Sequence, residues 1–249
     1  MRLYGAETYA HLKGLHIAIV GIGGVGSWAV ESLARSGVGK ITLIDFDEVS
    51  ITNVNRQVPA LTSTVGKKKT QVMKERVLQI NPDCECHIID DFLTLDNMSE
   101  YIRADYDGVI DAIDSITFKA ALIYFCRRNK IMIITTGGAG GCTDPTAVQI
   151  ADLSNTYNDA LASKVRKRLR EDFHFPSKPK RRFNVPCVFS KQQPVYPKED
   201  GSVSHAKPGI HGVHLDCSMG YGASSFVTAT FGLMAAARCL EKALKAKQG

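Results

Sequence analysis

Short apolar runs alternate with longer segments of mixed polarity along the first 140 residues of the chain. Five of these runs have the length and the β-branched character of buried strands, and they lie at residues 15–20, 40–45, 86–90, 108–111 and 130–136. The longer segments between them predict helices at residues 27–36, 67–80, 95–102 and 115–128. This alternation predicts an α/β fold that is Rossmann-like, with a mostly parallel sheet and helices on both faces.

The pattern changes after residue 136. A glycine-rich turn at 135–141 is followed by a candidate strand at 148–153 and by a basic helix at 160–170. Residues 176–208 are rich in Pro, Lys and Ser with little periodicity, which predicts a long exposed loop region. A terminal helix over about 224–246 is apolar nearly all round, and we expect it to pack on the sheet. We therefore expect a domain at 1–153 and a C-terminal extension at 154–249 that forms one compact unit with it.

The composition of the chain limits the classes of protein to which it can belong. A chain of 249 residues with 44% hydrophobic content can bury a full core, and this excludes disordered and fibrous classes. The seven cysteines contain no CxxC pair, which argues against a disulfide framework or a structural zinc site and fits a reducing cytoplasm. The start of the chain has no signal-peptide pattern. The uncharged stretch 217–237 contains many Ser, Thr and Gly residues, so we expect a buried helix there rather than stable membrane insertion.

The positive charge of the chain is local. The formal net charge is +6, yet residues 164–182 alone carry nine basic and two acidic side chains. The remainder of the chain is therefore close to neutral. A basic stretch of this density is typical of a surface that meets an anionic partner, although a solvated face is the alternative.

A glycine-rich loop follows the first predicted strand and opens a helix. The loop GIGGVG holds glycines at positions 21, 23, 24 and 26, where they allow a tight turn and the approach of a phosphate to the amino end of the helix. Asp45 ends the second predicted strand, where a carboxylate in this fold usually binds ribose hydroxyls. On these two features alone, an NAD-dependent dehydrogenase is the default hypothesis.

The next segments argue against that default. Arg56 and the lysine cluster 67–69 would face the phosphates, and hydride transfer has no use for such cations. At the end of a later predicted strand, Asp111 and Asp114 present carboxylates that could hold Mg²⁺. Together these groups indicate a site that binds ATP and Mg²⁺ for attack at a phosphate.

This ordered set of motifs resembles the ubiquitin-activating-type adenylating superfamily. The resemblance covers residues 15–140 through GIGGVG, LIDFDEVSITNVNRQ, VGKKK and DAID. It implies that the first domain is an ATP-binding adenylating domain and that the protein is a homodimer. Among the three lysines, Lys69 occupies the lysine of the family's VGxxK pattern, whereas Lys67 and Lys68 are interpreted as a solvated helix start. The roles that the resemblance implies are phosphate binding for Gly21, Gly23, Gly24, Gly26, Arg56 and Lys69, ribose binding for Asp45, lining of the nucleotide site for Asn53 and Gln57, and Mg²⁺ binding for Asp114.

The second half of the chain indicates which branch of the superfamily the sequence resembles. Members that activate ubiquitin-like carrier proteins commonly add CxxC pairs or a thioester-forming cysteine, and the CxxC pairs are absent here. Instead, the segments 135–173, 187–190, 195–197 and 216–232 resemble the tRNA threonylcarbamoyladenosine dehydratase branch. This implies ATP-dependent cyclisation of the threonylcarbamoyl side chain on adenosine 37 of tRNA. The carboxylate would be activated as an acyl-adenylate, with release of pyrophosphate and then AMP, and no enzyme nucleophile would be required.

The basic stretch then has a candidate partner in tRNA. The candidate tRNA-binding residues are Lys164, Arg166, Lys167, Arg168, Arg170, Lys180, Arg181 and Arg182. Within the superfamily, adenylation of the C-terminus of a ubiquitin-like carrier protein is the alternative function. An NAD-dependent oxidoreductase and a nucleotide-sensing module without chemistry are alternatives from other classes. The resemblance also leaves open a sulfur-acceptor or sulfurtransferase partner protein.

Overall fold

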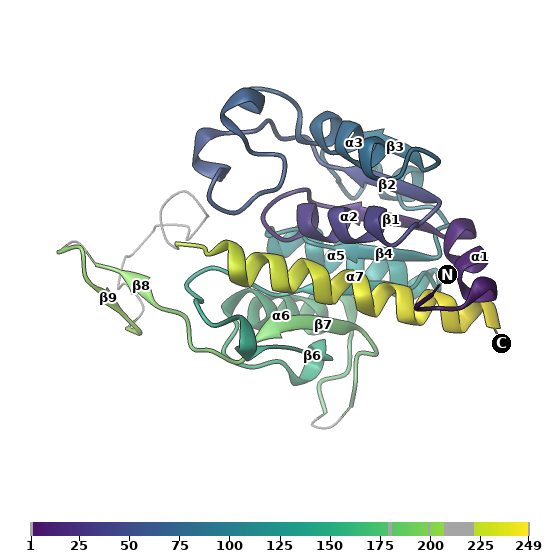
Figure 1. The fold of residues 1–249 in the computed structure, drawn as a ribbon. Coiled ribbons are helices and arrows are strands. Elements are labelled where there is room, and N and C mark those ends of the chain that lie inside the picture. Colours follow the sequence, from purple (N-terminus) through teal and green to yellow (C-terminus); the bar gives the residue numbers. More distant parts are fainter. Residues whose placement is uncertain (1, 179–180, 199, 207–221, 249) are drawn as a thin grey trace.

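One central sheet organises the computed structural model, which describes residues 2–178, 181–198, 200–206 and 222–248 (Figure 1). Within these residues the sheet has seven strands in the order β3-β2-β1-β4-β5-β7-β6, parallel throughout except for β6 against β7. The strands are β1 (His16–Val20), β2 (Lys40–Ile44), β3 (Glu85–Ile89), β4 (Gly108–Asp111), β5 (Ile133–Thr136), β6 (Val148–Asp152) and β7 (Pro186–Ser190). The predicted Rossmann-like α/β class is confirmed.

Helices cover both faces of this sheet. They are α1 (Ala6–Gly14), α2 (Gly26–Arg35), α3 (Lys69–Ile80), α4 (Met98–Tyr101), α5 (Ile116–Arg128), α6 (Ala160–Phe173) and α7 (Ser225–Gln248). Successive strand residues point to opposite faces, so Ile17 and Ile19 of β1 join the core beneath α2, α3 and α7, whereas Ala18 and Val20 join the core with α5 and α6. Figure 1 shows α7, in yellow, lying along the sheet next to α2.

The terminal helix packs as the sequence predicts. It contacts β4, β5, β6 and β7 as well as α2, and its residues Val227, Phe231, Ala235 and Cys239 are fully buried. Gly232 makes the close approach to α2 feasible, because a Cβ there would lie 2.7 Å from the Cβ of Trp28. Among the described helices, none combines the length and the apolar character that crossing a bilayer requires.

One part of the sequence prediction is wrong. The predicted loop region 176–208 contains β7, a buried strand that lies between β5 and β6 in the sheet. The run from Cys187 to Ser190 is short and is flanked by Pro- and Lys-rich segments, so its apolar character is diluted in any longer window. The region also holds a small hairpin of β8 (Tyr196–Pro197) and β9 (Val203–Ser204). A domain boundary at residue 153 stays a prediction, although β7 and α7 of the extension pack with the first five strands.

Two helices also differ from the sequence pattern. The helix α1 was not predicted, because only Leu12 of its nine residues is buried and the pattern is correspondingly weak. The helix predicted at 95–102 is reduced to the four residues of α4. Neither difference affects the prediction of the strands that position the candidate site.

The first prediction concerns the packing of α7. Phe231→Ala should lower the free energy of unfolding by about 3–5 kcal/mol, since it removes a fully buried aromatic ring between α7 and the sheet. Leu233→Ala on the same helix removes a half-exposed side chain and should cost about 1 kcal/mol or less. Urea denaturation followed by circular dichroism measures both. Equal losses for the two variants would contradict the packing described here.

Candidate active site at the carboxyl edge of the sheet

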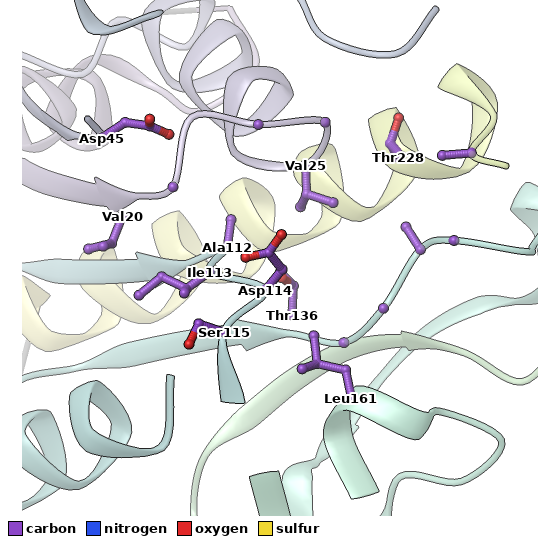
Figure 2. Close-up of a pocket in the computed structure, with 18 of the residues that line it drawn as sticks. Val20, Val25, Asp45, Ala112, Ile113, Asp114, Ser115, Thr136, Leu161 and Thr228 are labelled. Carbon is purple, nitrogen blue, oxygen red and sulfur yellow. The ribbon is translucent and has the colours of Figure 1, made fainter. Parts of the chain in front are cut away.

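A cavity of about 480 Å³ lies along the carboxyl ends of the parallel strands (Figure 2). Parallel strands that alternate with helices bring the loops after the strands to one edge, which is where ligands bind in folds of this class. The predicted site residues Gly21, Gly23, Gly24, Asp45, Asn53, Arg56, Gln57, Lys69 and Asp114 all line this cavity. Positions spread over almost a hundred residues of sequence are thus brought together.

The glycine loop is shaped by contacts that exclude larger residues. Gly21 has φ of +88°, and a Cβ there would lie 2.8 Å from the carbonyl oxygen of Ala112 at the end of β4. Gly26 starts α2 behind the cavity lining, and a Cβ there would overlap the carbonyl oxygen of Gly21. The loop can therefore fold tightly between β1 and α2, and the amino end of α2 adjoins the cavity.

Asp45 joins the end of β2 to this loop. Its Oδ2 accepts a hydrogen bond from the Ile22 backbone N–H at 2.5 Å, and its Oδ1 accepts one from the Asp47 N–H at 2.8 Å. Burial raises the pKa of the Asp45 carboxyl, while the nearby Lys69 ammonium opposes that shift. In Figure 2 the side chain of Asp45 lies beside the loop that follows β1.

Two cations flank the cavity on the same side. The side chain of Lys69 is only 6% exposed, and its Nζ lies 2.6 Å from Oδ2 of Asp47. Arg56 donates from Nη1 to the carbonyl oxygen of Thr52 at 2.8 Å, and its own carbonyl oxygen accepts from Trp28 Nε1 at 3.1 Å. Both cations are thus held in position before any ligand arrives, next to the glycine loop.

Gln57 supplies a buried polar atom that faces the cavity. Its Oε1 is buried and has no hydrogen-bond partner among the described residues. A buried carbonyl oxygen without a donor costs about 1–3 kcal/mol, and a ligand N–H or O–H group would relieve that cost. Asn53, four residues earlier, lines the cavity while its Oδ1 accepts from the Ser50 backbone N–H at 3.0 Å.

The two aspartates at the end of β4 have different environments. Asp114 is exposed and lines the cavity, as Figure 2 shows. Asp111 is fully buried: its Oδ1 lies 3.0 Å from Lys119 Nζ, and its Oδ2 accepts from Thr135 Oγ1 at 2.6 Å. Burial raises the pKa of Asp111, and the Lys119 ammonium opposes this. The expectation that both carboxylates could reach a metal ion is therefore wrong for Asp111, which pairs with Lys119 instead.

The carboxylates of the cavity suit a metal ion that binds together with a phosphate-containing ligand. Among the described residues, no three His, Cys, Asp or Glu side chains cluster closely enough to hold a metal ion by themselves. Mg²⁺ is usually held by one or two carboxylates together with substrate phosphates and water. The exposed carboxylate of Asp114, beside the glycine loop, fits that mode of binding.

The basic stretch separates into two groups. Lys164 of α6 is exposed and lines the cavity, and Lys167 and Arg168 form surface pairs with Glu171 and Asp172. Arg166 and Arg170 instead lie partly buried: Arg166 donates to Thr156 Oγ1, and the Arg170 guanidinium packs over the Phe183 ring at 5.4 Å. Burial lowers the pKa of Arg166. Arg181 and Arg182 are exposed, and Lys180 lies outside the described residues.

Sequence reasoning missed three groups in the cavity. Asp159, the N-cap of α6, is a buried carboxylate, and Asp47 pairs with Lys69. Phe46, Phe92 and Phe118 form edge-to-face contacts at one end. An aspartate one position before an apolar-periodic segment is a readable N-cap signal, but nothing in the sequence says that this cap lies against the turn after β5.

The chain was compared with protein-family models, with curated proteins and with solved structures. The ThiF family model matches residues 1–249. This chain belongs to the ThiF family. Its curated relatives include the tRNA threonylcarbamoyladenosine dehydratases of Haemophilus influenzae, 51% identical over 99% of this chain and 92% of the relative, and of Escherichia coli, 51% identical over 100% and 94%. The crystal structure of the E. coli dehydratase, TcdA, in complex with ATP is 48% identical over 100% and 94%, with a TM-score of 0.87.

The ThiF-family cavity contains no reactive thiol among its described residues. The six described cysteines are buried, and burial raises the pKa of Cys84 to about 11 and of Cys86 and Cys239 to about 12. Cys187 is fully buried, and burial raises its pKa well above the usual value for a thiol. Cys217 lies outside the described residues.

The second prediction follows from these thiols. At neutral pH, iodoacetamide should leave Cys84, Cys86, Cys126, Cys142, Cys187 and Cys239 unmodified in the native protein, because a buried thiol with a raised pKa supplies almost no thiolate. The same residues should all be modified in urea. Peptide mass spectrometry measures the modification at each site. Rapid native modification of Cys142, which lines the cavity, would contradict the burial described here.

Proposed function

We propose that this protein uses ATP to cyclise the threonylcarbamoyl side chain of adenosine 37 in tRNA, releasing AMP and pyrophosphate. The observation that carries the proposal is that one cavity is lined by all the predicted nucleotide residues except Gly26 and also by Lys164 of the basic stretch. Dehydratase relatives that match over nearly the full chain support the same reaction. Adenylation of a carrier-protein C-terminus is not favoured, because the relatives at this identity are dehydratases.

The roles of the nucleotide-side residues follow from their positions. Asp45 would accept hydrogen bonds from ribose hydroxyls, and Gln57 Oε1 and Asn53 would line the nucleotide. Gly21, Gly23, Gly24 and Gly26 give the loop its shape, so the phosphates can approach the backbone at the amino end of α2. Arg56 and Lys69 would neutralise phosphate charge, with Lys69 exchanging Asp47 for a phosphate oxygen.

Asp114 would hold Mg²⁺ together with the triphosphate. When bound, the ion would neutralise charge that develops on the phosphate oxygens. Asp111 has no direct part in this binding, because it is buried against Lys119.

The reaction proceeds in two steps. The threonyl carboxylate attacks the α-phosphorus of ATP, and pyrophosphate leaves with Arg56 and Lys69 stabilising the extra negative charge. The product is an acyl-adenylate, which is a far better electrophile than a carboxylate. The carbamoyl group, held next to it in the same molecule, then attacks the acyl carbon and expels AMP. No enzyme nucleophile is needed, in agreement with the buried cysteines.

The tRNA would approach along α6 and the segment that follows it. Lys164, Lys167, Arg168, Arg181 and Arg182 present their charges on the surface and suit contact with the phosphate backbone. Arg166 and Arg170 are better assigned to anchoring α6, since both are partly buried against neighbouring residues. Lys180 remains a candidate contact outside the described residues.

Association of two copies is part of the proposal. The segment after β2 exposes Ile51, Val54, Leu61 and Val65, and such a group of exposed apolar side chains on one segment is typical of a protein interface. A cytoplasmic location suits the reduced cysteines and the tRNA substrate. A sulfur-acceptor or sulfurtransferase partner protein stays a prediction without a supporting contact in the described residues.

The third prediction tests the phosphate cations. Arg56→Ala and Lys69→Ala should each lower the rate of AMP formation with threonylcarbamoylated tRNA by about 10²–10³-fold, because each removes a fixed charge from the transition state of adenylation. Lys67→Ala, at an exposed position two residues before the start of α3, is the matched control and should retain full activity. Full activity in the Lys69→Ala protein would contradict the proposed role.

The fourth prediction tests the tRNA surface. The double variant Lys164→Ala/Lys167→Ala should raise KM for tRNA and reduce the slope of log affinity against log salt by about two, because two backbone contacts are lost. ATP binding should be unchanged. Lys242→Ala/Lys245→Ala on α7 removes the same charge elsewhere and serves as control. If both double variants weaken tRNA binding equally, the contact is not specific to α6.

A further inference from the structure

The cavity extends well past the residues that suit a nucleotide. Beyond Asp114 it continues along the turn after β5, the end of β7 and the start of α6. This second half is lined by Thr136, Gly137, Gly138, Asn158, Asp159, Leu161, Lys164 and Ser190. Figure 2 shows Thr136 and Leu161 on the far side of Asp114 from Asp45. If the nucleotide occupies the half near Asp45, the group that attacks its α-phosphate must lie in this other half.

Asp159 is the carboxylate of this second half. The residue is only 8% exposed, and its two oxygens are held from opposite sides. Oδ1 accepts from the Ala162 N–H of α6 at 2.8 Å, and Oδ2 accepts from the Gly138 N–H at 3.0 Å. A Cβ at Gly137 would overlap Oδ2, so only glycine at 137 lets the carboxylate lie against the turn after β5.

The surroundings of Asp159 make it a stronger base than an exposed aspartate. Burial raises the pKa of its carboxyl, and no ion pair joins it to a lysine or arginine within the described residues. The titratable groups that face it are Lys119 of α5, Arg166 of α6, Cys142 and Cys187. Each carboxylate oxygen has a second lone pair beyond the backbone N–H that it already accepts, so a further hydrogen-bond donor can be bound.

The second step of the proposed reaction requires such a base. An atom of the carbamoyl group forms a bond to the acyl carbon, the bond from that carbon to the AMP oxygen breaks, and AMP leaves with the electron pair. Whichever atom attacks, one N–H proton of the carbamoyl group must be lost for the ring to be neutral. A carboxylate placed beside the acyl group can take it, and such proton transfers contribute about 10²–10⁴-fold.

We infer that Asp159 is the general base that accepts the carbamoyl N–H proton as the ring closes, an inference that rests on the proposed function. A second role as the N-cap of α6 is compatible with this, because the backbone hydrogen bonds fix the carboxylate without using all of its lone pairs. The two roles separate by substitution. Asparagine keeps the cap on the Ala162 N–H through its single side-chain oxygen, loses the hydrogen bond from the Gly138 N–H, and cannot accept this proton.

The experiment follows both steps in one turnover. Asp159→Asn is mixed with ATP, Mg²⁺ and threonylcarbamoylated tRNA, and pyrophosphate, AMP and the cyclic nucleoside are measured against time. Pyrophosphate release should stay within about threefold of the native rate, whereas ring closure should slow by about 100-fold or more. The acyl-adenylate should then accumulate, and hydroxylamine should trap it as a hydroxamate. Asp144→Asn, at an exposed helix cap outside the cavity lining, is the matched control and should leave both rates unchanged.

Two results would overturn the inference. Unchanged ring closure in Asp159→Asn would show that the residue is a cap alone, and equal slowing of both steps would show that it only shapes the site. If the asparagine variant does not fold, Asp159→Ser, which also supplies a good N-cap without a base, is measured in its place. Absence of pyrophosphate release in the native protein would count against the proposed function itself, and is therefore distinguishable from a failure at Asp159.

Discussion

The buried ion pair between Asp111 and Lys119 holds the end of β4 in place, and the candidate site is built around that end. Lys119 Nζ lies 3.0 Å from Asp111 Oδ1 and donates to the carbonyl oxygen of Ile113 at 2.8 Å, so it fixes the turn that leads to Asp114. The carbonyl oxygen of Ala112 lies in the same turn and leaves no room for a side chain at position 21, which must therefore be glycine. Removing one partner of such a pair typically costs about 3–5 kcal/mol, because the other charge stays buried. The positions of the glycine loop and of Asp114 therefore depend on one contact outside the cavity lining.

Around this centre the two sides of the cavity carry different groups. The side near β1 and β2 holds Arg56 and Lys69, which suit an anionic triphosphate, together with Asp45 and Asp47. The side near β5 and α6 holds Asp159, with Lys164 exposed at the rim. A reaction that first activates a carboxylate at phosphorus and then removes a proton needs these two environments in this order. The two halves meet at Asp114, beside the loop after β1.

Sequence motifs name residues that the fold brings to one cavity, because the glycine loop and Asp45 each follow directly on a parallel strand. Asp45 follows β2 directly, so its spacing from the strand places it, whereas Lys69, at the start of α3, was singled out from its neighbours by the family resemblance. Residue type and spacing alone could not separate Asp111 from Asp114, which only the resemblance singled out, since the fold is needed to show that the last residue of β4 faces Lys119. Arg166 and Arg170 were grouped with their neighbours for the same reason. Their exposure depends on which side of α6 packs against the rest of the chain.

The half of the cavity near β5 and α6 was predicted less well because it is assembled from distant segments. Strand β7 lies in a Pro- and Lys-rich region, and its partner β5 is about fifty residues earlier. Asp159 lines the cavity because α6 starts against the turn after β5. The local sequence pattern does not reveal this contact.

Activation and cyclisation of the threonylcarbamoyl group of tRNA in this cavity can be measured directly. The protein is incubated with ATP, Mg²⁺ and threonylcarbamoylated tRNA, the nucleosides are analysed by mass spectrometry, and AMP is quantified. We expect a nucleoside lighter by one water, formed in equal amount with AMP. Absence of both products under conditions where the protein is folded would contradict this expectation.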